Sequence, residues 1–303
     1  PSRVWRARPW ERLTCHLLCP WASSMVTVST MARSSSSRDI SFDTDFGPAR
    51  IRWDGPRATL FLGDVESSAV DTSDPTYLEF EYMQHMDAVV SSLWGPQDRF
   101  RALHVGGAAC ALACAWSSSR PNSRHVAVEV DRLLAEQVRE HFPIPKAPQV
   151  KIRVGDGRAV LDGAREGSFD VIVRDAFASG VTPDHLRTVE CADRARRTLT
   201  ASGLYLVNCA HGGPANARQD VAALQEVFPF VASIQDPKVG RGGRRGNVVA
   251  LASAADVVDV DQIDRALRML ALPARITRPA DLARWVAGTP ALTDAQVGYP
   301  QAD

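Results

Sequence analysis

The sequence predicts an α/β fold built on a mostly parallel β-sheet with helices on both faces, preceded by a small N-terminal β-hairpin segment. From residue 101 onwards, short apolar runs alternate with helix-length segments, whereas the region before residue 75 shows alternating runs separated by a turn. Regular alternation of strand and helix is typical of parallel sheets, because a helical crossover brings the next strand back in the same direction. The expected strands are 102–105, 125–130, 150–154, 169–173, 204–207, 231–234 and 248–252, and the expected helices are 108–117, 131–141, 183–200 and 214–227.

Four segments are expected along the chain. Residues 1–38 are rich in Arg, Trp and Ser and lack the hydrophobic core and cleavage site of a signal peptide, so we expect a disordered tail. Residues 39–75 form the expected β-hairpin segment, in which Asp54-Gly55-Pro56 turns between two alternating runs. Residues 76–255 hold the sheet domain, which opens with a helix over 76–90. Residues 256–303 are expected to form a C-terminal helical extension, with a helix at 260–270, and a tail.

The end of the sheet domain refines the fold class. The last two expected strands, 231–234 and 248–252, are joined by an Arg/Gly loop without a long helix, which predicts antiparallel pairing. A parallel sheet that ends in an antiparallel pair is typical of the Rossmann-like sheet of class I S-adenosylmethionine methyltransferases. We therefore expect a Rossmann-like sheet of this type.

Composition excludes several classes of function. The 303 residues are 45% hydrophobic and carry no net charge, which removes the main electrostatic argument for nucleic-acid binding. No apolar run approaches the length needed to cross a bilayer, so no membrane partner is expected. None of the six Cys shows the paired CxxC spacing of a zinc site, and no metal is expected. This cysteine pattern suits a reducing, cytoplasmic location.

A strand that ends in two glycines is the first candidate binding element. Leu103-His-Val-Gly-Gly107 runs directly into the helix expected from residue 108. Gly106 and Gly107 let backbone N–H groups approach a ligand that a Cβ atom would keep away, and a helix N-terminus adds partial positive charge. A structural turn is the alternative explanation. The residues after Gly107 are Ala-Ala-Cys-Ala, without the further glycine that NAD-binding loops use around a pyrophosphate, so the loop favours a ligand without phosphates.

Three acids lie at three further strand ends, where a parallel sheet forms its ligand crevice. Glu129 follows Gly106 by 23 residues, the place where Rossmann proteins hold ribose hydroxyls; an ordinary strand-end charge is the alternative. A carboxylate suits a diol because it can accept both O–H groups. Asp156 can accept from the exocyclic amine of adenine while the N–H of Gly157 donates to a ring nitrogen, or can form a simple turn. Asp175 would lie at the reacting end of the ligand. Together these positions favour S-adenosylmethionine or a close relative.

At this point the residues resemble the spermidine synthase (polyamine aminopropyltransferase) family, and most of all its divergent actinobacterial branch. The likeness covers about residues 45–255. It is carried by the helix Tyr77-Leu-Glu-Phe-Glu-Tyr-Met-Gln-His85, the glycine pair, Val128-Glu-Val-Asp131, Gly155-Asp-Gly157 and Phe169-Asp-Val-Ile-Val-Arg-Asp175. The resemblance implies decarboxylated S-adenosylmethionine or S-adenosylmethionine as co-substrate and a small-molecule amine or other small acceptor as partner. It also implies a homodimer paired through N-terminal strands.

The same resemblance implies roles for individual residues. It implies that Glu129 holds the ribose, Asp156 reads adenine, and Asp175 helps deprotonate the attacking amine. It also implies that the stretch containing Tyr82, Gln84 and His85 lines the substrate side of the site.

The chain also departs from the family pattern. Ala178 stands where the family has a second acid that helps bind the cationic amine, and Asn208-Cys-Ala-His211 replaces a polar, Gln-rich segment. We therefore expect adenosyl binding to be kept and diamine recognition to be reduced.

The sequence favours a transferase that moves an aminopropyl group to an amine, as in polyamine biosynthesis, with Asp175 as the catalytic base. His85 and His211 are candidates for a supporting role. Two alternatives stay open. An S-adenosylmethionine-dependent methyltransferase would use the same fold and adenosyl contacts, and a non-catalytic protein could keep the fold as a binding module.

Overall fold

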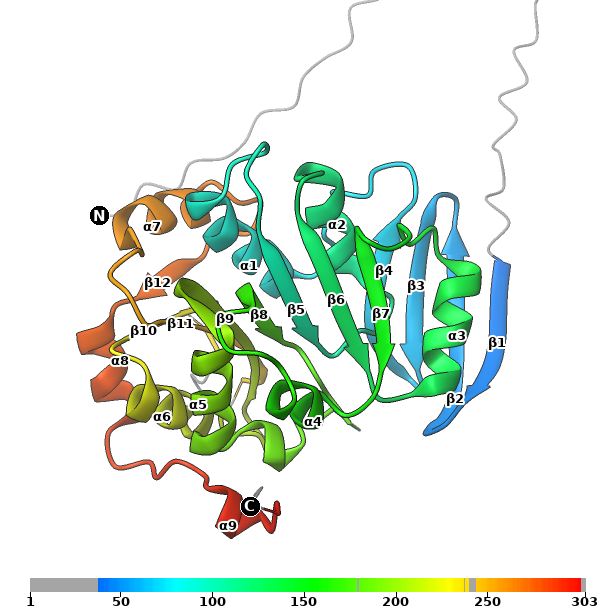
Figure 1. Cartoon of the computed structure of the whole chain (residues 1–303). Helices are drawn as coiled ribbons and strands as arrows, with labels where there is room; N and C mark the ends of the chain where they lie inside the picture. The colour runs from blue at the N-terminus through cyan, green and yellow to red at the C-terminus, as the bar shows by residue number, and fades with distance from the viewer. Residues whose placement is uncertain (1–37, 179, 237, 240–243, 301–303) are drawn as a thin grey trace, which may run out of the picture. The chain divides into compact units, whose positions relative to one another are not determined.

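The computed structural model describes residues 38–178, 180–236, 238–239 and 244–300, which form two β-sheets and the helices around them (Figure 1). The tail expected over residues 1–38 lies outside the described residues, except that Arg38 already begins the first strand. Residues 240–243 of the Arg/Gly loop also lie outside them. The smaller sheet is antiparallel, with β1 (Arg38–Thr44), β2 (Gly47–Asp54), β3 (Arg57–Leu62) and β4 (Val65–Asp71) in sequence order. The predicted turn at Asp54-Gly55-Pro56 joins β2 to β3, so the expected hairpin is the centre of a four-stranded sheet.

The larger sheet has eight strands in the order β12-β10-β11-β9-β8-β5-β6-β7. Five neighbouring strands are parallel: β5 (Arg101–Val105), β6 (Arg124–Glu129), β7 (Val150–Val154), β8 (Phe169–Arg174) and β9 (Leu199–His211). β11 (Gly246–Ser253), β10 (Phe230–Gln235) and β12 (Arg275–Thr277) continue the sheet in antiparallel pairing. The predicted α/β class and the antiparallel pairing of the last two expected strands are confirmed, whereas β12 was not expected.

The strand order creates a switch point beside β5. From β5 the chain builds β6 and β7 on one side and then returns to add β8 and β9 on the other. The connections that leave the carboxyl ends of β5 and β8 therefore run in opposite directions, which opens a crevice between them. Gly106 and Asp175 directly follow these two strands.

The helices begin where local capping allows. They are α1 (Glu81–Leu93), α2 (Ala111–Ser119), α3 (Arg132–His141), α4 (Gly157–Asp162), the 3-10 turn η1 (Asp184–Leu186), α5 (Val189–Thr198), α6 (Ala217–Val227), α7 (Val260–Arg268), α8 (Pro279–Val286) and α9 (Asp294–Val297). The helix expected from residue 76 starts at Glu81, because Asp74 accepts hydrogen bonds from Thr76 and holds a turn there. The helix expected over 183–200 starts only at Val189, where Thr188 caps it by accepting from the N–H of Cys191 at 3.2 Å.

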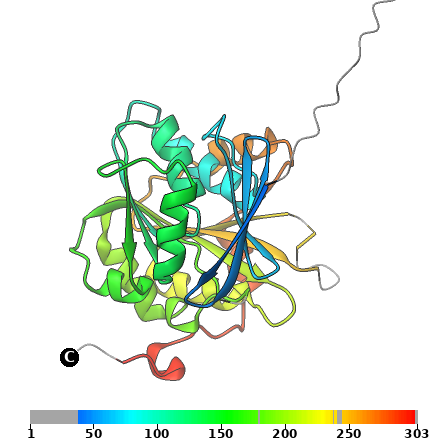
Figure 2. The same cartoon turned by 90° about the vertical axis from the view of Figure 1, so that its right-hand side faces the viewer.

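Two apolar layers cover the faces of the larger sheet. Successive strand residues point to opposite faces, so Ala102 of β5 packs with α1, α2 and the smaller sheet, whereas Leu103 packs with α4, α5 and α6. Burying a side chain of the size of Leu103 contributes about 1.5–3 kcal/mol. The smaller sheet lies beside α3 (Figure 2), where the rings of Phe42 and His141 have centroids 6.3 Å apart.

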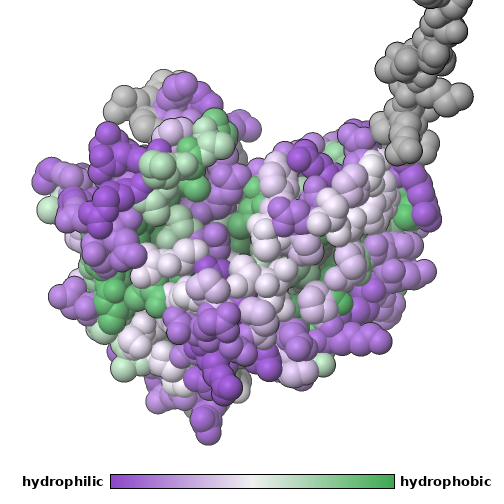
Figure 3. Space-filling view, turned by 90° about the horizontal axis from the view of Figure 1, so that it is seen from above, coloured by the Kyte–Doolittle hydropathy of each residue, from purple (hydrophilic) through white to green (hydrophobic). Residues whose placement is uncertain are grey.

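The surface is mixed in character. Hydrophilic side chains cover much of the face seen from above, with hydrophobic residues interspersed (Figure 3). No helix within the described part of the chain is both long and apolar enough to cross a membrane.

Candidate functional site

A cavity of about 600 Å³ lies at the carboxyl ends of the parallel strands, next to the switch point. The end of the smaller sheet borders it with Phe46 and Val65, two large apolar residues that are 75% and 55% exposed. The predicted site residues that line the cavity are Tyr82, Gly106, Gly107, Glu129, Asp156, Gly157 and Asp175. The structure therefore brings together seven of the ten residues for which the sequence predicted a role at the site.

Gly106 fixes the switch point because only glycine fits there. Its φ is +100°, and a Cβ atom would lie 2.1 Å from the backbone oxygen of Asp175. This close approach joins the turns after β5 and β8, and the N–H of Asp175 donates to the carbonyl of Val105 at 2.8 Å. Gly157 is similarly constrained, since a Cβ atom there would lie 2.3 Å from Cγ1 of Val105.

The loop after the glycine pair moves the start of α2 further along the chain. Ala108 and Cys110 have φ of 38° and 57°, the left-handed region that residues with a Cβ atom seldom occupy. α2 therefore begins at Ala111 rather than at residue 108 as the sequence predicted. Backbone strain of this kind is concentrated at functional sites.

Glu129 lies at the end of β6 and faces this loop. Its Oε2 accepts from the N–H of Ala108 at 2.9 Å and of Gly107 at 3.3 Å, and its Oε1 accepts from the N–H of Asp131 at 3.1 Å. Burial raises the pKa of Glu129, while these three donors oppose the rise. The carboxylate is thus held in one orientation at the cavity wall.

Asp156 begins α4 and has two partners. Oδ1 accepts from the N–H of Ala159 at 2.9 Å, and Oδ2 lies 2.9 Å from Nε2 of His185, which also borders the cavity. The hydrogen bond from His185 lowers the pKa of Asp156. Asp156 is therefore an anion at neutral pH.

Asp175 lies beside the switch point, at the centre of a polar cluster that it forms with Tyr82 and Asn208. Its Oδ2 accepts from the hydroxyl of Tyr82 at 2.8 Å, and its Oδ1 accepts from Nδ2 of Asn208 at 2.8 Å. Burial raises the pKa of Asp175 above the ordinary range of an aspartate, and the two donors oppose this rise. Burial also raises the pKa of Tyr82, so its hydroxyl stays a proton donor.

Gln84 and His85 are not brought to the cavity. The Gln84 side chain donates to the carbonyl of Leu78 at 2.8 Å, and His85 is 5% exposed, with its pKa lowered by burial to about 4. Gln84 lies two positions and His85 three positions after Tyr82 in α1, so they point about 200° and about 300° around the helix axis from it. The packing of α1 leaves Tyr82 as the one of these three side chains that borders the cavity. The structure does not bring these two side chains to the cavity, and their role on the substrate side stays a prediction.

His211 and Ala178 belong to the segments in which the chain departs from the family pattern, and they lie in different surroundings. His211 lies away from the cavity lining, where Nδ1 accepts from the N–H of Ala217 at 3.3 Å and the ring is tilted against Trp285. Ala178 does border the cavity and forms a small bridge with Val181. A supporting role for His211 at the cavity is therefore not favoured.

Asn208 and His185 border the cavity, although the sequence predicted no role for either residue. Asn208 is 2% exposed within the otherwise apolar run 203–210 of β9, and its Oδ1 has no hydrogen-bond partner among the residues that the structure describes. A polar residue in such a run is a readable signal, because a buried amide needs partners. His185 carries no comparable signal, since its contact with Asp156 joins residues 29 positions apart.

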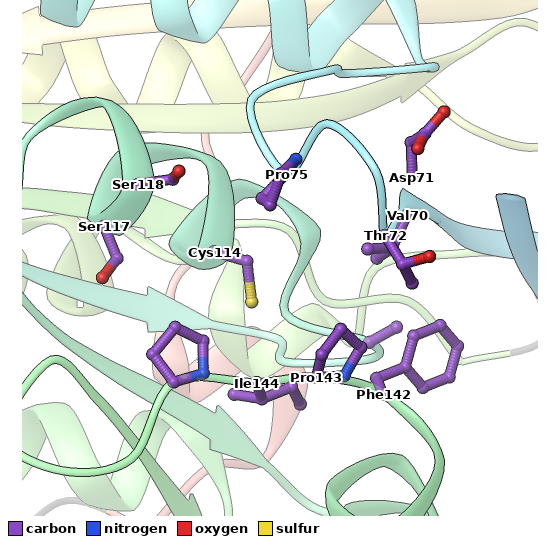
Figure 4. A pocket seen from close by; sticks show the side chains of 12 residues that line it. Val70, Asp71, Thr72, Pro75, Cys114, Ser117, Ser118, Phe142, Pro143 and Ile144 are labelled. Atoms are coloured by element: carbon purple, nitrogen blue, oxygen red, sulfur yellow. The ribbon is translucent and has the colours of Figure 1, made fainter. Parts of the chain in front are cut away.

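A second cavity, of about 220 Å³, lies between the end of β4, α2 and the loop after α3 (Figure 4). Cys114 points into it, but burial raises the pKa of this thiol to about 12, so it is not a nucleophile at neutral pH. The oxygen Oδ1 of Asp71 is bound by the hydroxyl and N–H of Ser73. The chemistry-bearing groups thus gather at the first cavity. Among the residues that the structure describes, no group of three or more His, Cys, Asp or Glu could hold a metal ion.

Comparisons with known proteins find similarity to individual proteins and solved structures. No family model matches the chain. A polyamine aminopropyltransferase of Vibrio vulnificus is 26% identical over 110 residues, which are 36% of this chain and 37% of that protein, so the chain spans little more than a third of this relative's length.

Solved structures match over more of the chain. A probable spermidine synthase of Corynebacterium glutamicum is 32% identical with a TM-score of 0.78, and the match covers 84% of this chain and 96% of that one. A spermidine synthase in complex with the transition-state analogue AdoDATO is 17% identical with a TM-score of 0.54, over 86% of this chain and 88% of that one. The second likeness concerns the fold alone, whereas the first extends to the sequence.

Proposed function

The chain belongs to the spermidine synthase family, and from that premise we propose that it transfers an aminopropyl group from decarboxylated S-adenosylmethionine to an amine. The observation that carries the proposal is Asp175, a buried carboxylate at the cavity that is held between Tyr82 and Asn208. Each of its oxygens accepts one hydrogen bond from these residues and keeps a lone pair for the amine.

We assign the adenosyl part of the co-substrate to the glycine pair and to the other two acids that border the cavity. In this proposal Gly106 and Gly107 allow close approach, Glu129 accepts from ribose, and Asp156 with Gly157 reads adenine. Both acids border the cavity, and backbone N–H groups fix each of them. These backbone contacts hold both acids in place before the co-substrate binds.

The proposed reaction is a displacement at carbon. The lone pair of the neutral amine forms a C–N bond to the aminopropyl carbon that is bonded to the sulfonium sulfur. The C–S bond breaks, its electron pair goes to the sulfonium sulfur, and methylthioadenosine leaves as a neutral thioether. The proton that the amine must lose passes to Asp175. Because sulfur already leaves readily, alignment and proton removal are the main tasks of the protein.

The surroundings of Asp175 suit a base. An ordinary aspartate is a weak proton acceptor at neutral pH, but burial raises the pKa of Asp175 and strengthens it as an acceptor. Tyr82 and Asn208 keep the carboxylate oriented as the proton arrives. We propose Asp175 as the catalytic base on these grounds, with Tyr82 as a substrate-binding residue.

The test uses Asp175→Asn, with release of methylthioadenosine as the readout. The variant keeps the shape of the side chain, and Asn208 can turn its unpaired Oδ1 toward the new amide. We expect kcat to fall by about 100- to 10,000-fold, with methylthioadenosine binding by calorimetry unchanged. Asp43→Asn, in the exposed part of β1, is the matched control and keeps full activity. Full turnover in Asp175→Asn refutes the assignment.

The choice of co-substrate separates the remaining readings. Calorimetry compares decarboxylated S-adenosylmethionine, S-adenosylmethionine and methylthioadenosine with the wild-type protein. Tighter binding of the decarboxylated form supports aminopropyl transfer. Tighter binding of the intact amino acid supports methyl transfer, and no binding of any of the three supports a non-catalytic module. A homodimer formed through the N-terminal strands stays a prediction, to be checked by light scattering.

A further inference from the structure

The segment that follows α8 is fastened to the region around α4 by a buried ion pair. Arg158 of α4 donates to both carboxylate oxygens of Asp294, at 2.9 and 2.6 Å, and the two side chains are 6% and 3% exposed. Thr188 donates to the same carboxylate at 2.7 Å. Two parallel hydrogen bonds between a guanidinium and a carboxylate fix their relative geometry. The start of α9 is therefore held at a defined place beside α4.

This anchor places Tyr299 against His185. The two rings are nearly parallel, with an interplanar angle of 6° and centroids 5.5 Å apart. The guanidinium carbon of Arg158 lies 4.5 Å from the centre of the Tyr299 ring, and the hydroxyl of Tyr299 donates to Asp162 at 3.3 Å. Stacking and cation–π contacts of this kind restrict the orientation of an aromatic ring. Tyr299 in turn limits the rotation of His185.

His185 passes this restraint to Asp156. The pKa of Asp156 is lowered, so the carboxylate is ionised and can only accept, and Nε2 of His185 is the donor in their 2.9 Å contact. The other oxygen of Asp156 is bound by the N–H of Ala159 at 2.9 Å. With one donor on each oxygen, the carboxylate plane is fixed and one lone pair per oxygen is left for a ligand in the cavity.

We propose that residues 294–299 are a positioning element of the nucleobase subsite, in which Tyr299 holds His185 and His185 sets the direction in which Asp156 accepts. The inference rests on the proposed function, because Asp156 must face the base of an adenosyl ligand. An oriented acceptor favours a purine with an amino group at the contacted position. It disfavours a purine with an oxo group there, because two acceptor oxygens would then face each other.

The probes are methylthioadenosine and its deaminated form, methylthioinosine, measured by calorimetry on the full chain. We expect the wild-type protein to prefer the amino form. Tyr299→Ala is expected to weaken binding of methylthioadenosine by about threefold to tenfold and to reduce the preference between the two nucleosides. Tyr299→Phe keeps the stacked ring and is expected to keep the preference.

Control variants separate the loss of positioning from a general destabilisation of the fold. Tyr77 is another tyrosine with an arginine over its ring, because the guanidinium carbon of Arg57 lies 4.8 Å from the ring centre, but it does not line the cavity. Tyr77→Ala is therefore expected to change neither the affinity for methylthioadenosine nor the preference between the two nucleosides. If Tyr299 acts through His185, then Tyr299→Ala has no further effect in a His185→Ala background. His185→Ala leaves the Arg158–Asp294 pair intact and tests the same idea should Tyr299→Ala unfold.

The outcomes distinguish this inference from the function on which it rests. Wild-type protein that binds neither nucleoside overturns the proposed function and the inference together. Wild-type protein that prefers methylthioadenosine, with the same preference in Tyr299→Ala and His185→Ala, overturns the inference alone. Additive effects of the two substitutions would show that Tyr299 does not act through His185.

Discussion

Tyr82→Phe removes one hydroxyl from the site while the ring keeps its stacking on Phe80, whose centroid lies 5.9 Å away. The lost group is the donor to Oδ2 of Asp175 at 2.8 Å. That hydrogen bond stabilises the ionised carboxylate and opposes the effect of burial on its pKa. Without it, the pKa of Asp175 rises further. Because only the ionised form can accept the proton of the amine, the acid limb of the activity profile moves to higher pH.

The size of the effect follows from the kind of bond. A buried hydrogen bond to a charged group contributes about 1.5–3 kcal/mol. At a pH where most Asp175 is protonated in both proteins, the ionised fraction and kcat/KM therefore fall by about tenfold to a hundredfold. At alkaline pH Asp175 is ionised with or without the hydroxyl, so the two proteins converge. The defect of Tyr82→Phe is thus largest in acid and smallest in base.

The assay follows methylthioadenosine release from decarboxylated S-adenosylmethionine and an amine, with kcat/KM measured across pH. Tyr77→Phe serves as the matched control, since this tyrosine lies outside the cavity lining, and its profile should overlay the wild type. Thermal unfolding confirms that both variants are folded. A Tyr82→Phe profile reduced by the same factor at every pH would refute the reasoning, because Tyr82 would then position substrate without tuning Asp175.

Three further substitutions test residues that shape or support the site. Gly106→Ala should abolish methylthioadenosine binding in calorimetry and lower the melting temperature, because its Cβ atom would lie 2.1 Å from the backbone oxygen of Asp175; a variant with wild-type binding would contradict this. Glu129→Ala should weaken methylthioadenosine binding by about tenfold or more, and unchanged calorimetric affinity would remove Glu129 from the ribose subsite. Asp220→Ala should lower the free energy of unfolding in urea by about 3–5 kcal/mol, because it leaves Arg174 buried without the carboxylate that lies 2.6 Å away. A loss below about 1 kcal/mol would show that Arg174 finds another partner.

The sequence predicted the parallel strands well for a physical reason. Strands buried on both faces need continuous apolar runs, and Val171–Val173 and Leu204–Val207 are such runs. β12 could not be found in this way, because its three residues, Arg275–Thr277, carry no period and depend on pairing with β10. Helix starts were misplaced where side-chain caps decided them, as Thr188 does for α5.

The acids of the site were predictable because chain connectivity alone places them. Carboxyl ends of neighbouring parallel strands meet at one edge, so Glu129, Asp156 and Asp175 had to converge once the strands were found. Contacts made by rotation of a side chain were not predictable in the same way. Gln84 and His85 share a helix with Tyr82 yet turn from the cavity, and the packing of α1 alone settles which residue faces inward.

The glycine loop and Glu129 sharpen the choice of ligand class. In a loop that binds a pyrophosphate, backbone N–H groups point at the phosphate oxygens. Here the N–H groups of Gly107 and Ala108 donate to Glu129, so a carboxylate of the chain already takes the place of such an anion. A phosphate at this position would meet a negative charge rather than free donors. The loop therefore favours a ligand that brings hydroxyl groups to Glu129.

The same contacts also revise how a ribose would bind. A carboxylate has about four acceptor positions, and Glu129 uses three of them for Gly107, Ala108 and Asp131. One position on Oε1 is left, so the two hydroxyls of a ribose cannot both bind unless one backbone contact yields. The contact with Gly107 is the longest of the three, at 3.3 Å, and is the one that a second hydroxyl would replace most easily. Ribose binding would then release the N–H of Gly107 toward the cavity, where it could donate to the same ribose, and Gly107 and Glu129 would act on the sugar as one unit.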